Sequence, residues 1–178
     1  SQTTDVVFQG STAPLTITGG QLGGAITVRD VTIANRISAL DTLANNVMSA
    51  VNYYQSSGFG SNGATGIPFF SGSSAATMAV NPAIQNNLAN IAASQAPNSP
   101  ADGSQATLIA QLQENPPPGA TVTLQAQYQT IISQLGVDGQ QAQAAVQTGG
   151  LVLQNLNAQQ SSVSAVSLNQ EAANLVQY

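Results

Sequence analysis

The 178-residue chain contains no Cys, no His and no Trp. It therefore cannot form a disulfide, a zinc–thiolate site or a catalytic site built on histidine. Only two residues are basic against seven acidic, which gives a net charge of -5. Too few cations are present to neutralise nucleic-acid phosphates or to hold the chain on anionic lipids. No apolar run reaches the roughly 18 residues that span a bilayer. We expect neither nucleic acid nor a membrane among its partners.

The polarity of the chain comes from neutral side chains. Only 5% of residues are charged, 42% are hydrophobic, and Gln, Asn, Ser and Thr make up most of the remainder. This composition is compatible with an exported protein that has a neutral surface, but it does not name a function.

The first third of the sequence predicts a small β piece followed by a long helix. Residues 6–8 and 15–17 are short β-prone stretches that predict a hairpin or a sheet edge, and we expect Gly19–Gly24 to form a loop. A stripe with alternating spacings of four and three residues then indicates helix-on-helix packing. Asp30 or Thr32 is the predicted cap, and Gly58 is the predicted end. The stripe consists of Ile33, Ile37, Leu40, Ala44, Val47, Val51 and Tyr54.

The middle of the chain predicts a loop and two short helices. We expect the loop over residues 58–74 to fold back and dock its three Phe residues on the preceding helix. Asn81-Pro82 is typical of a helix start, and that helix is expected to run to about Ser94. Asp102 is a candidate cap for another helix, which carries Leu108, Ile109 and Leu112 and ends before the Pro116–Pro118 run.

A second long apolar stripe begins near Thr123. We expect one helix to about Gln160, with a kink allowed near Gly136–Gly139, and Ser167–Gln170 resembles a capping box that opens a last helix. The stripe consists of Tyr128, Ile132, Leu135, Ala142, Val146, Leu153 and Leu156. Because the pattern stops abruptly at Tyr178, we expect the sequence to be part of a longer chain.

The predicted fold class is mainly α, an elongated antiparallel bundle of long helices with a small β piece near the N-terminus. Residues 1–24 would form a β-hairpin and loop, part of a β domain or a connection. Residues 25–178 would form a rod-like helical domain with a variable loop insertion at about residues 58–121.

No residue pattern supports catalysis or a cofactor. Gly19–Gly24 lacks the Lys and the Ser or Thr of a phosphate-binding loop, so a flexible connection is the simpler interpretation. The carboxylates Asp30, Asp41, Asp102, Glu114, Asp138 and Glu171 are widely separated, and helix capping explains two of them more simply than paired-carboxylate chemistry. A serine nucleophile would find neither His nor Lys as its base. We expect no catalytic residue, no metal site and no cofactor.

The two cations have structural interpretations. Arg29 beside Asp30 is more typical of an ion pair at a helix start than of a binding site. Arg36 lies beside the first stripe, where it is placed to pair with a carboxylate of the facing helix.

The C-terminal region carries a specific resemblance. Residues 160–175 read QSSVSAVSLNQEAANL, which resembles the S-V-S-G-V-N-L-D-E-E-A-A-N-L signature of the flagellar hook-associated protein 1 (FlgK) family. Ala165, Ser167, Asn169 and Gln170 depart from that signature. Earlier segments agree in order: GQLGGA leading to Arg29-Asp30, Gly58-Phe59 through Asn62-Gly63 to Phe69-Phe70-Ser71, and Asp102-Gly103 followed by residues 106–112. The similarity covers roughly residues 19–178 and is weakest over residues 72–100.

This resemblance implies a structural component of the bacterial flagellum at the hook–filament junction, and not an enzyme. Its partners would be copies of itself in a junction ring, the hook protein and the second junction protein. The parent chain would leave the cell by type III export, guarded by a chaperone, and would be extracellular. The terminal coiled-coil helices that drive assembly would lie outside this sequence, so the chain alone is expected to be monomeric. The motif residues expected to pack between subunits are Ser162, Val163, Val166, Leu168, Glu171, Asn174 and Leu175.

Other functions remain open at this point. Another flagellar axial protein, such as the hook protein or the other junction protein, shares the terminal helices but fits the central segments less well. A surface adhesin or recognition module is suggested by the neutral Asn, Gln and Ser surface, with residues 72–100 as its variable region.

Overall fold

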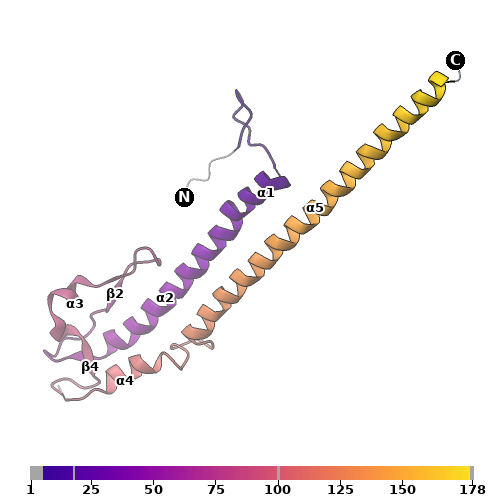
Figure 1. The fold of residues 1–178 in the computed structure, drawn as a ribbon. Coiled ribbons are helices and arrows are strands. Elements are labelled where there is room, and N and C mark those ends of the chain that lie inside the picture. Colours follow the sequence, from indigo (N-terminus) through magenta and orange to yellow (C-terminus); the bar gives the residue numbers. More distant parts are fainter. Residues whose placement is uncertain (1–5, 18, 100, 177–178) are drawn as a thin grey trace.

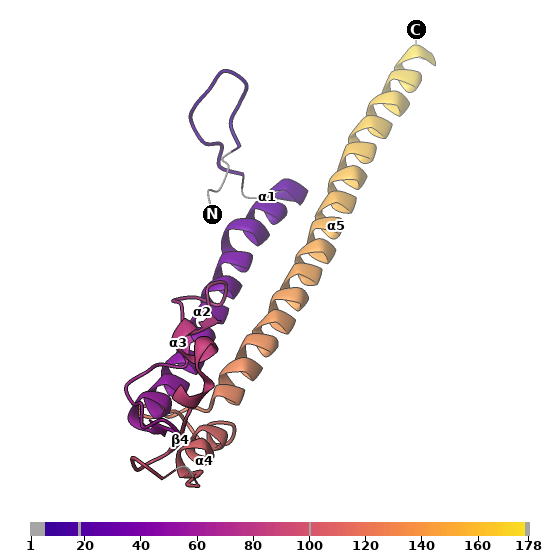
Figure 2. The same cartoon turned by 90° about the vertical axis from the view of Figure 1, so that its left-hand side faces the viewer.

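The computed structural model describes residues 6–17, 19–99 and 101–176, with side chains up to residue 163 (Figure 1). Two long helical rods run side by side in opposite directions in both views, and the short elements gather at one end (Figures 1 and 2). The predicted class, mainly helical and elongated with antiparallel long helices, is confirmed. Within the described residues, no helix combines the length and the apolar content needed to cross a bilayer.

The first rod is helical from Gly20 to Ser57. It consists of α1 (Gly20–Thr27), a π-helical turn (Val28–Thr32) and α2 (Ile33–Ser57). The predicted loop at Gly19–Gly24 and the predicted start at Asp30 or Thr32 are therefore wrong. Each Gly destabilises a helix by only about 1 kcal/mol relative to Ala. A first turn that leads directly into a long helix can tolerate this cost. The predicted end is confirmed, because Gly58 is extended and its N–H donates to the Tyr54 carbonyl.

The β piece before α1 is small. Val7 pairs with Pro14 in a single antiparallel bridge, and Leu15 N–H donates to the Val6 carbonyl at 2.7 Å. Of the two predicted alternatives, a hairpin or a sheet edge, the structure thus shows a small hairpin, with Gly10 at φ +85° in its turn.

The segment between α2 and α4 contains two small sheets that the sequence did not predict. Strand β1 (Phe59–Gly60) pairs antiparallel with β4 (Ala92–Ser94), and β2 (Phe70–Ser71) pairs antiparallel with β3 (Ala79–Val80). We call residues 58–99 the insertion. Asn81 caps α3 (Pro82–Asn86) as predicted, with its side chain accepting from Ala83 N–H. The helix predicted to reach Ser94 is wrong, because α3 is followed by a 3-10 turn (Leu88–Asn90) and then by β4.

Helix α4 (Ser104–Gln111) follows Asp102, whose carboxylate accepts from Ser104 N–H at 2.9 Å. After a Pro-rich loop the chain forms α5 (Leu124–Val176), a single helix of 53 residues and about 80 Å. Neither a break at Gly136–Gly139 nor a new start at Ser167 occurs, so the predicted capping box is wrong. The backbone hydrogen bonds of one uninterrupted helix satisfy the groups that a cap would otherwise serve.

The core lies where α2 meets the insertion and α4. The buried hydrophobic residues among those described are Ala44, Met48, Ala50, Ile84, Ala92 and Leu112. Along the rest of the rods, α5 lies beside the first rod and continues past the start of α1 (Figure 1). The long helices therefore present most of their surface outward.

Candidate subunit-packing surface

Helices α2 and α5 meet along a seam that contains two polar contacts. Arg36 Nε on α2 lies 3.4 Å from Asp138 Oδ2 on α5, and both side chains are about one-fifth to one-quarter exposed. Further along α2, Asn46 Nδ2 donates to Gln127 Oε1 at 2.6 Å, nearer the start of α5. The predicted pairing of Arg36 with a carboxylate of the facing helix is confirmed. This pair and the amide pair fix the antiparallel register.

The predicted apolar stripes do not form this seam. Ile33, Ile37 and Leu40 on α2 are 43–53% exposed, and Tyr128, Ile132 and Leu135 on α5 are 48–55% exposed. We call these six residues the apolar face. Only the C-terminal part of the first stripe is covered. Ala44 is buried, and Val47 and Val51 are half-buried near the insertion. The stripes were expected to meet each other, and that expectation is wrong for the part nearer α1.

Both halves of the apolar face lie on the same side of the helix pair. Ile37 directly follows the seam residue Arg36, and on α5 Tyr128 directly follows the seam residue Gln127. One residue turns a helix by about 100°, so each apolar side chain is rotated from the seam in the same sense along its own chain. Because the two helices are antiparallel, this equal rotation brings both sets to one side. The apolar face therefore runs along one side of both helices.

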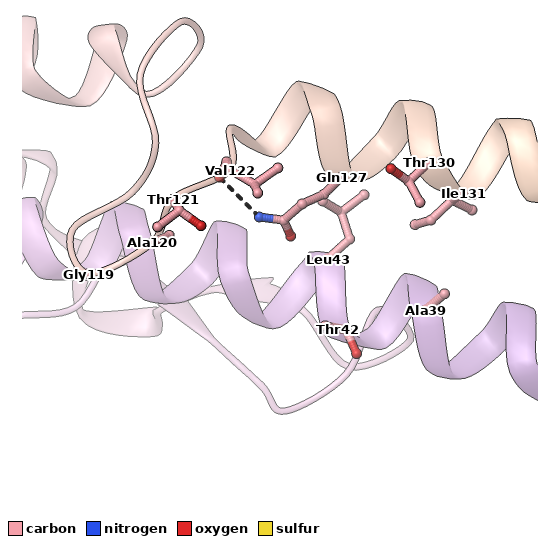
Figure 3. A pocket seen from close by; sticks show the side chains of 10 residues that line it. All are labelled: Ala39, Thr42, Leu43, Gly119, Ala120, Thr121, Val122, Gln127, Thr130 and Ile131. Atoms are coloured by element: carbon pink, nitrogen blue, oxygen red, sulfur yellow. Dashed lines mark hydrogen bonds between the residues drawn. The ribbon is translucent and has the colours of Figure 1, made fainter.

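The opposite side of the helix pair holds an open cleft of about 550 Å³. Figure 3 shows it between α2, the loop of residues 119–122 and α5, with Gln127 Nε2 donating to the Val122 carbonyl. Leu43 and Ile131 line the seam, and Thr42 and Thr130 directly precede them. Each Thr is therefore rotated by about 100° from the seam, in the direction opposite to the apolar face. The cleft is lined by neutral side chains and backbone, so it offers no charge for an ionic ligand.

One face of the second half of α2 holds the insertion by hydrogen bonds to the main chain of the insertion. Asn52 donates to the Phe70 carbonyl at 2.9 Å and accepts from Phe70 N–H at 2.8 Å. Gln55, which is 1% exposed, donates to the Asn90 carbonyl at 2.8 Å and accepts from Ala92 N–H at 3.1 Å. Each carboxamide thus offers both a donor and an acceptor, as a neighbouring strand would.

The same face of α2 has two further anchors nearer α1. Asp41 Oδ1 accepts from Ala75 N–H at 2.8 Å, and Asn45 Nδ2 donates to the Ser73 carbonyl at 3.0 Å. The predicted folding-back of the Phe-containing loop onto this helix is confirmed, and hydrogen bonds from α2 side chains to the main chain of the loop hold it. Sequence reasoning missed these anchors. The four anchors lie three, four or seven residues from Met48, so they share one face of the helix with it. This pattern of polar residues around a central Met was the signal in the sequence that could have indicated them.

The charged residues singled out from the sequence have structural partners. Arg29 forms two contacts with Asp30, at 2.5 Å and 2.8 Å, and hydrogen bonding from Arg29 lowers the pKa of Asp30. The pair lies inside the continuous helix and not at a helix start, so that part of the prediction is wrong. Among the described residues, no three His, Cys, Asp or Glu side chains are grouped as a metal site would require.

Asp102 joins the end of the insertion to α4. Its carboxylate accepts from the Ser94 hydroxyl at 3.0 Å, from Gln95 N–H at 3.1 Å and from Ser104 N–H at 2.9 Å. Hydrogen bonds from the side chain and backbone of Ser104, followed by those from Gln95 and Ser94, lower the pKa of Asp102 to about 2. The cap position of α4 is Gly103, one residue after the predicted cap, and Asp102 bonds the first N–H of the helix as part of a larger bridge.

The C-terminal motif lies in the last part of α5. Ser162 and Val163 are exposed, and Val163 is 71% exposed. The side chains of the other five motif residues, Val166, Leu168, Glu171, Asn174 and Leu175, lie outside the described part of the structure. Their role in subunit packing stays a prediction.

Comparison with known proteins gives one match, to the first part of the chain. No curated protein and no solved structure matches the chain. Residues 71–178 lie outside the one match that the comparison gives. That match is the family model described as the flagellar hook-associated protein FlgK helical domain, and it covers residues 1–70, which include α1, α2 and the start of the insertion.

Proposed function

We propose that the chain is part of a structural component of the bacterial flagellum at the hook–filament junction, where it packs between hook and filament subunits. The match of residues 1–70 to the FlgK helical domain carries this proposal. Its partners would be copies of itself, the hook protein and the second junction protein. The protein would act outside the cell, and its work would be mechanical and not catalytic.

The arrangement of the helices supports a packing role. A junction subunit must transmit load between neighbours, and two long antiparallel rods offer extended lateral surfaces for this. The apolar face lies along both rods on one side, with six side chains about half exposed. We propose that an amphipathic helix of the assembled axial structure covers this face. Completing the burial of each side chain would contribute roughly 1 kcal/mol.

A structural role is tested first in cells that lack the parent gene. Electron microscopy should show hooks without filaments, and flagellin should accumulate in the medium. Normal filaments on these cells would overturn the proposal and favour the adhesin or recognition function.

The apolar face is tested by complementing those cells with point variants of the parent gene. Ile37→Asp places a charge on the face and should reduce swarming and increase flagellin in the medium. Ser38→Asp is the matched control, because Ser38 is exposed and lies about 100° further round the same helix. Equal motility of the two variants at equal protein levels would exclude the face as a packing surface.

The chain alone is proposed to be monomeric. Six half-exposed side chains offer less than the roughly 800 Å² per partner that a standard stable interface buries. Sedimentation should therefore give the mass of one chain at micromolar concentration. A stable ring or filament would contradict this.

A further inference from the structure

Asn62 and Gly63 form the only Asn-Gly pair in the sequence. They occupy a turn between β1 and the rest of the insertion, in which Asn62 is exposed and Gly63 is half-buried. Gly63 has φ +79°, and its N–H donates to the Gly60 carbonyl at 2.9 Å. No heavy atom lies within 4 Å of the position where a Cβ on Gly63 would stand. The turn is thus narrow, glycine-dependent and open on its outer side.

We propose that Asn62 is a site of spontaneous covalent modification, at which the amide is converted to aspartate and isoaspartate, and that this conversion releases the turn from residues 87–92. The chemistry needs only water. The Gly63 N–H first leaves its hydrogen bond to the Gly60 carbonyl. A solvent base then removes the proton from Gly63 N, and this nitrogen attacks Asn62 Cγ. The new C–N bond closes a succinimide ring, while the bond from Cγ to Nδ2 breaks and Nδ2 takes the proton back from the solvent base and leaves as ammonia. Water then opens the ring at either carbonyl.

Three features of the turn favour this reaction at Asn62. Gly63 has no side chain to hinder the approach of its nitrogen. Asn62 Oδ1 accepts a hydrogen bond from Ala64 N–H at 3.0 Å, so a donor already stands where negative charge develops on that oxygen. The side chain of Asn62 is exposed, so water can reach the ring.

The consequence follows from what Asn62 holds. Its Nδ2 donates to Asn90 Oδ1 at 2.7 Å, and the Asn90 amide nitrogen is occupied by the Ala83 carbonyl. A carboxylate at position 62 would place oxygen against oxygen, and Asn90 cannot reverse its amide without losing Ala83. Isoaspartate also lengthens the main chain inside a turn closed by the Gly60–Ala64 and Gly63–Gly60 hydrogen bonds. Modification therefore weakens the link to the segment that leads into β4.

The reaction is tested by ageing the intact chain at neutral and mildly alkaline pH and mapping its peptides by mass spectrometry. Asn98 is the internal reference, because it is exposed and is followed by Ser99. We expect conversion at Asn62 to be several-fold faster than at Asn98, to yield isoaspartate and to accelerate with pH. Retention of the amide at Asn62 while Asn98 is converted would overturn the proposal. The variant Asn62→Gln should abolish the early product.

The release of the turn is tested by amide hydrogen exchange over residues 87–92. The aged protein and Asn62→Asp should both exchange faster there than the fresh protein. Asn98→Asp is the matched control, since it adds the same charge at an exposed site that no hydrogen bond described here joins to residues 87–92. If Asn62→Asp and Asn98→Asp exchange alike, the turn does not hold this segment and the second half of the proposal fails.

Discussion

Arg36 and Asp138 face each other across the seam of α2 and α5, with 3.4 Å between Nε and Oδ2. Both atoms are buried and have no hydrogen-bond partner among the described residues. The pair is therefore held by charge without the directed hydrogen bonds of an ideal ion pair, and each charge depends on the other for compensation.

Removing one member of this pair should cost more than removing both. Arg36→Met leaves the Asp138 carboxylate half-buried without a counter-ion, and we expect a loss of roughly 1–2 kcal/mol in the free energy of unfolding, between the values of exposed and buried pairs. The double variant Arg36→Met/Asp138→Leu should recover most of it. Urea denaturation measures both, with Glu114→Gln as an exposed control. Strictly additive losses would show that the pair does not couple.

Gln55 should be the most sensitive polar residue of α2. Gln55→Ala leaves Ala92 N–H and the Asn90 carbonyl without partners in a buried site, and each such group costs about 1–3 kcal/mol. We expect lower stability and faster hydrogen exchange at the Ala92 amide. Gln113→Ala, at an exposed position, should change neither. Unchanged exchange at Ala92 would mean that water replaces the carboxamide without penalty.

Gly60 should not tolerate a side chain. A Cβ at this position would lie 2.1 Å from the Ala89 carbonyl oxygen, so Gly60→Ala must displace backbone and should cost about 1–3 kcal/mol. Gly103→Ala is the control, because no heavy atom lies within 4 Å of its Cβ position. Thermal unfolding of the two variants measures the difference, and equal melting temperatures would disprove the close approach.

Asp102 should make stability depend on pH in the acid range. Its pKa falls to about 2 in the folded chain, below the value of about 3.9 in unfolded chains. The stabilisation is present above pH ~4 and is lost as the pH falls through ~2, because the unfolded state binds the proton more readily. Denaturation at a series of pH values should show this loss. Asp102→Asn should remove that part of the pH dependence, and an unchanged profile would contradict the assignment.

The long helices were predictable because their periodicity extends over many turns. The end of α2 at Gly58, the cap at Asn81 and the partner of Arg36 also followed from local residue chemistry. The start of α1 did not, because a single glycine-rich stretch cannot reveal how much helix follows it. The C-terminal capping box failed for a related reason, since Ser167 has cap chemistry but lies within an already formed helix.

The sheets could not be predicted from local sequence. Strands of two or three residues, such as β1 and β4, carry no period of their own. Contacts with Gln55 and between distant segments create them. The exposure of the apolar face could not be predicted either. An apolar stripe indicates which residues share one side of a helix, but it does not indicate what covers that side.

The anchors on α2 have a consequence for how freely the insertion can change. Asn45, Asn52, Gln55 and Asp41 hold carbonyl oxygens and N–H groups, which every residue except proline supplies. Side chains at Ser73 and Ala75 take no part in these bonds and can be replaced without loosening the attachment. The first rod thus binds the backbone of the insertion and does not depend on the identity of these side chains. The same helices can therefore carry insertions with different surface side chains at this end.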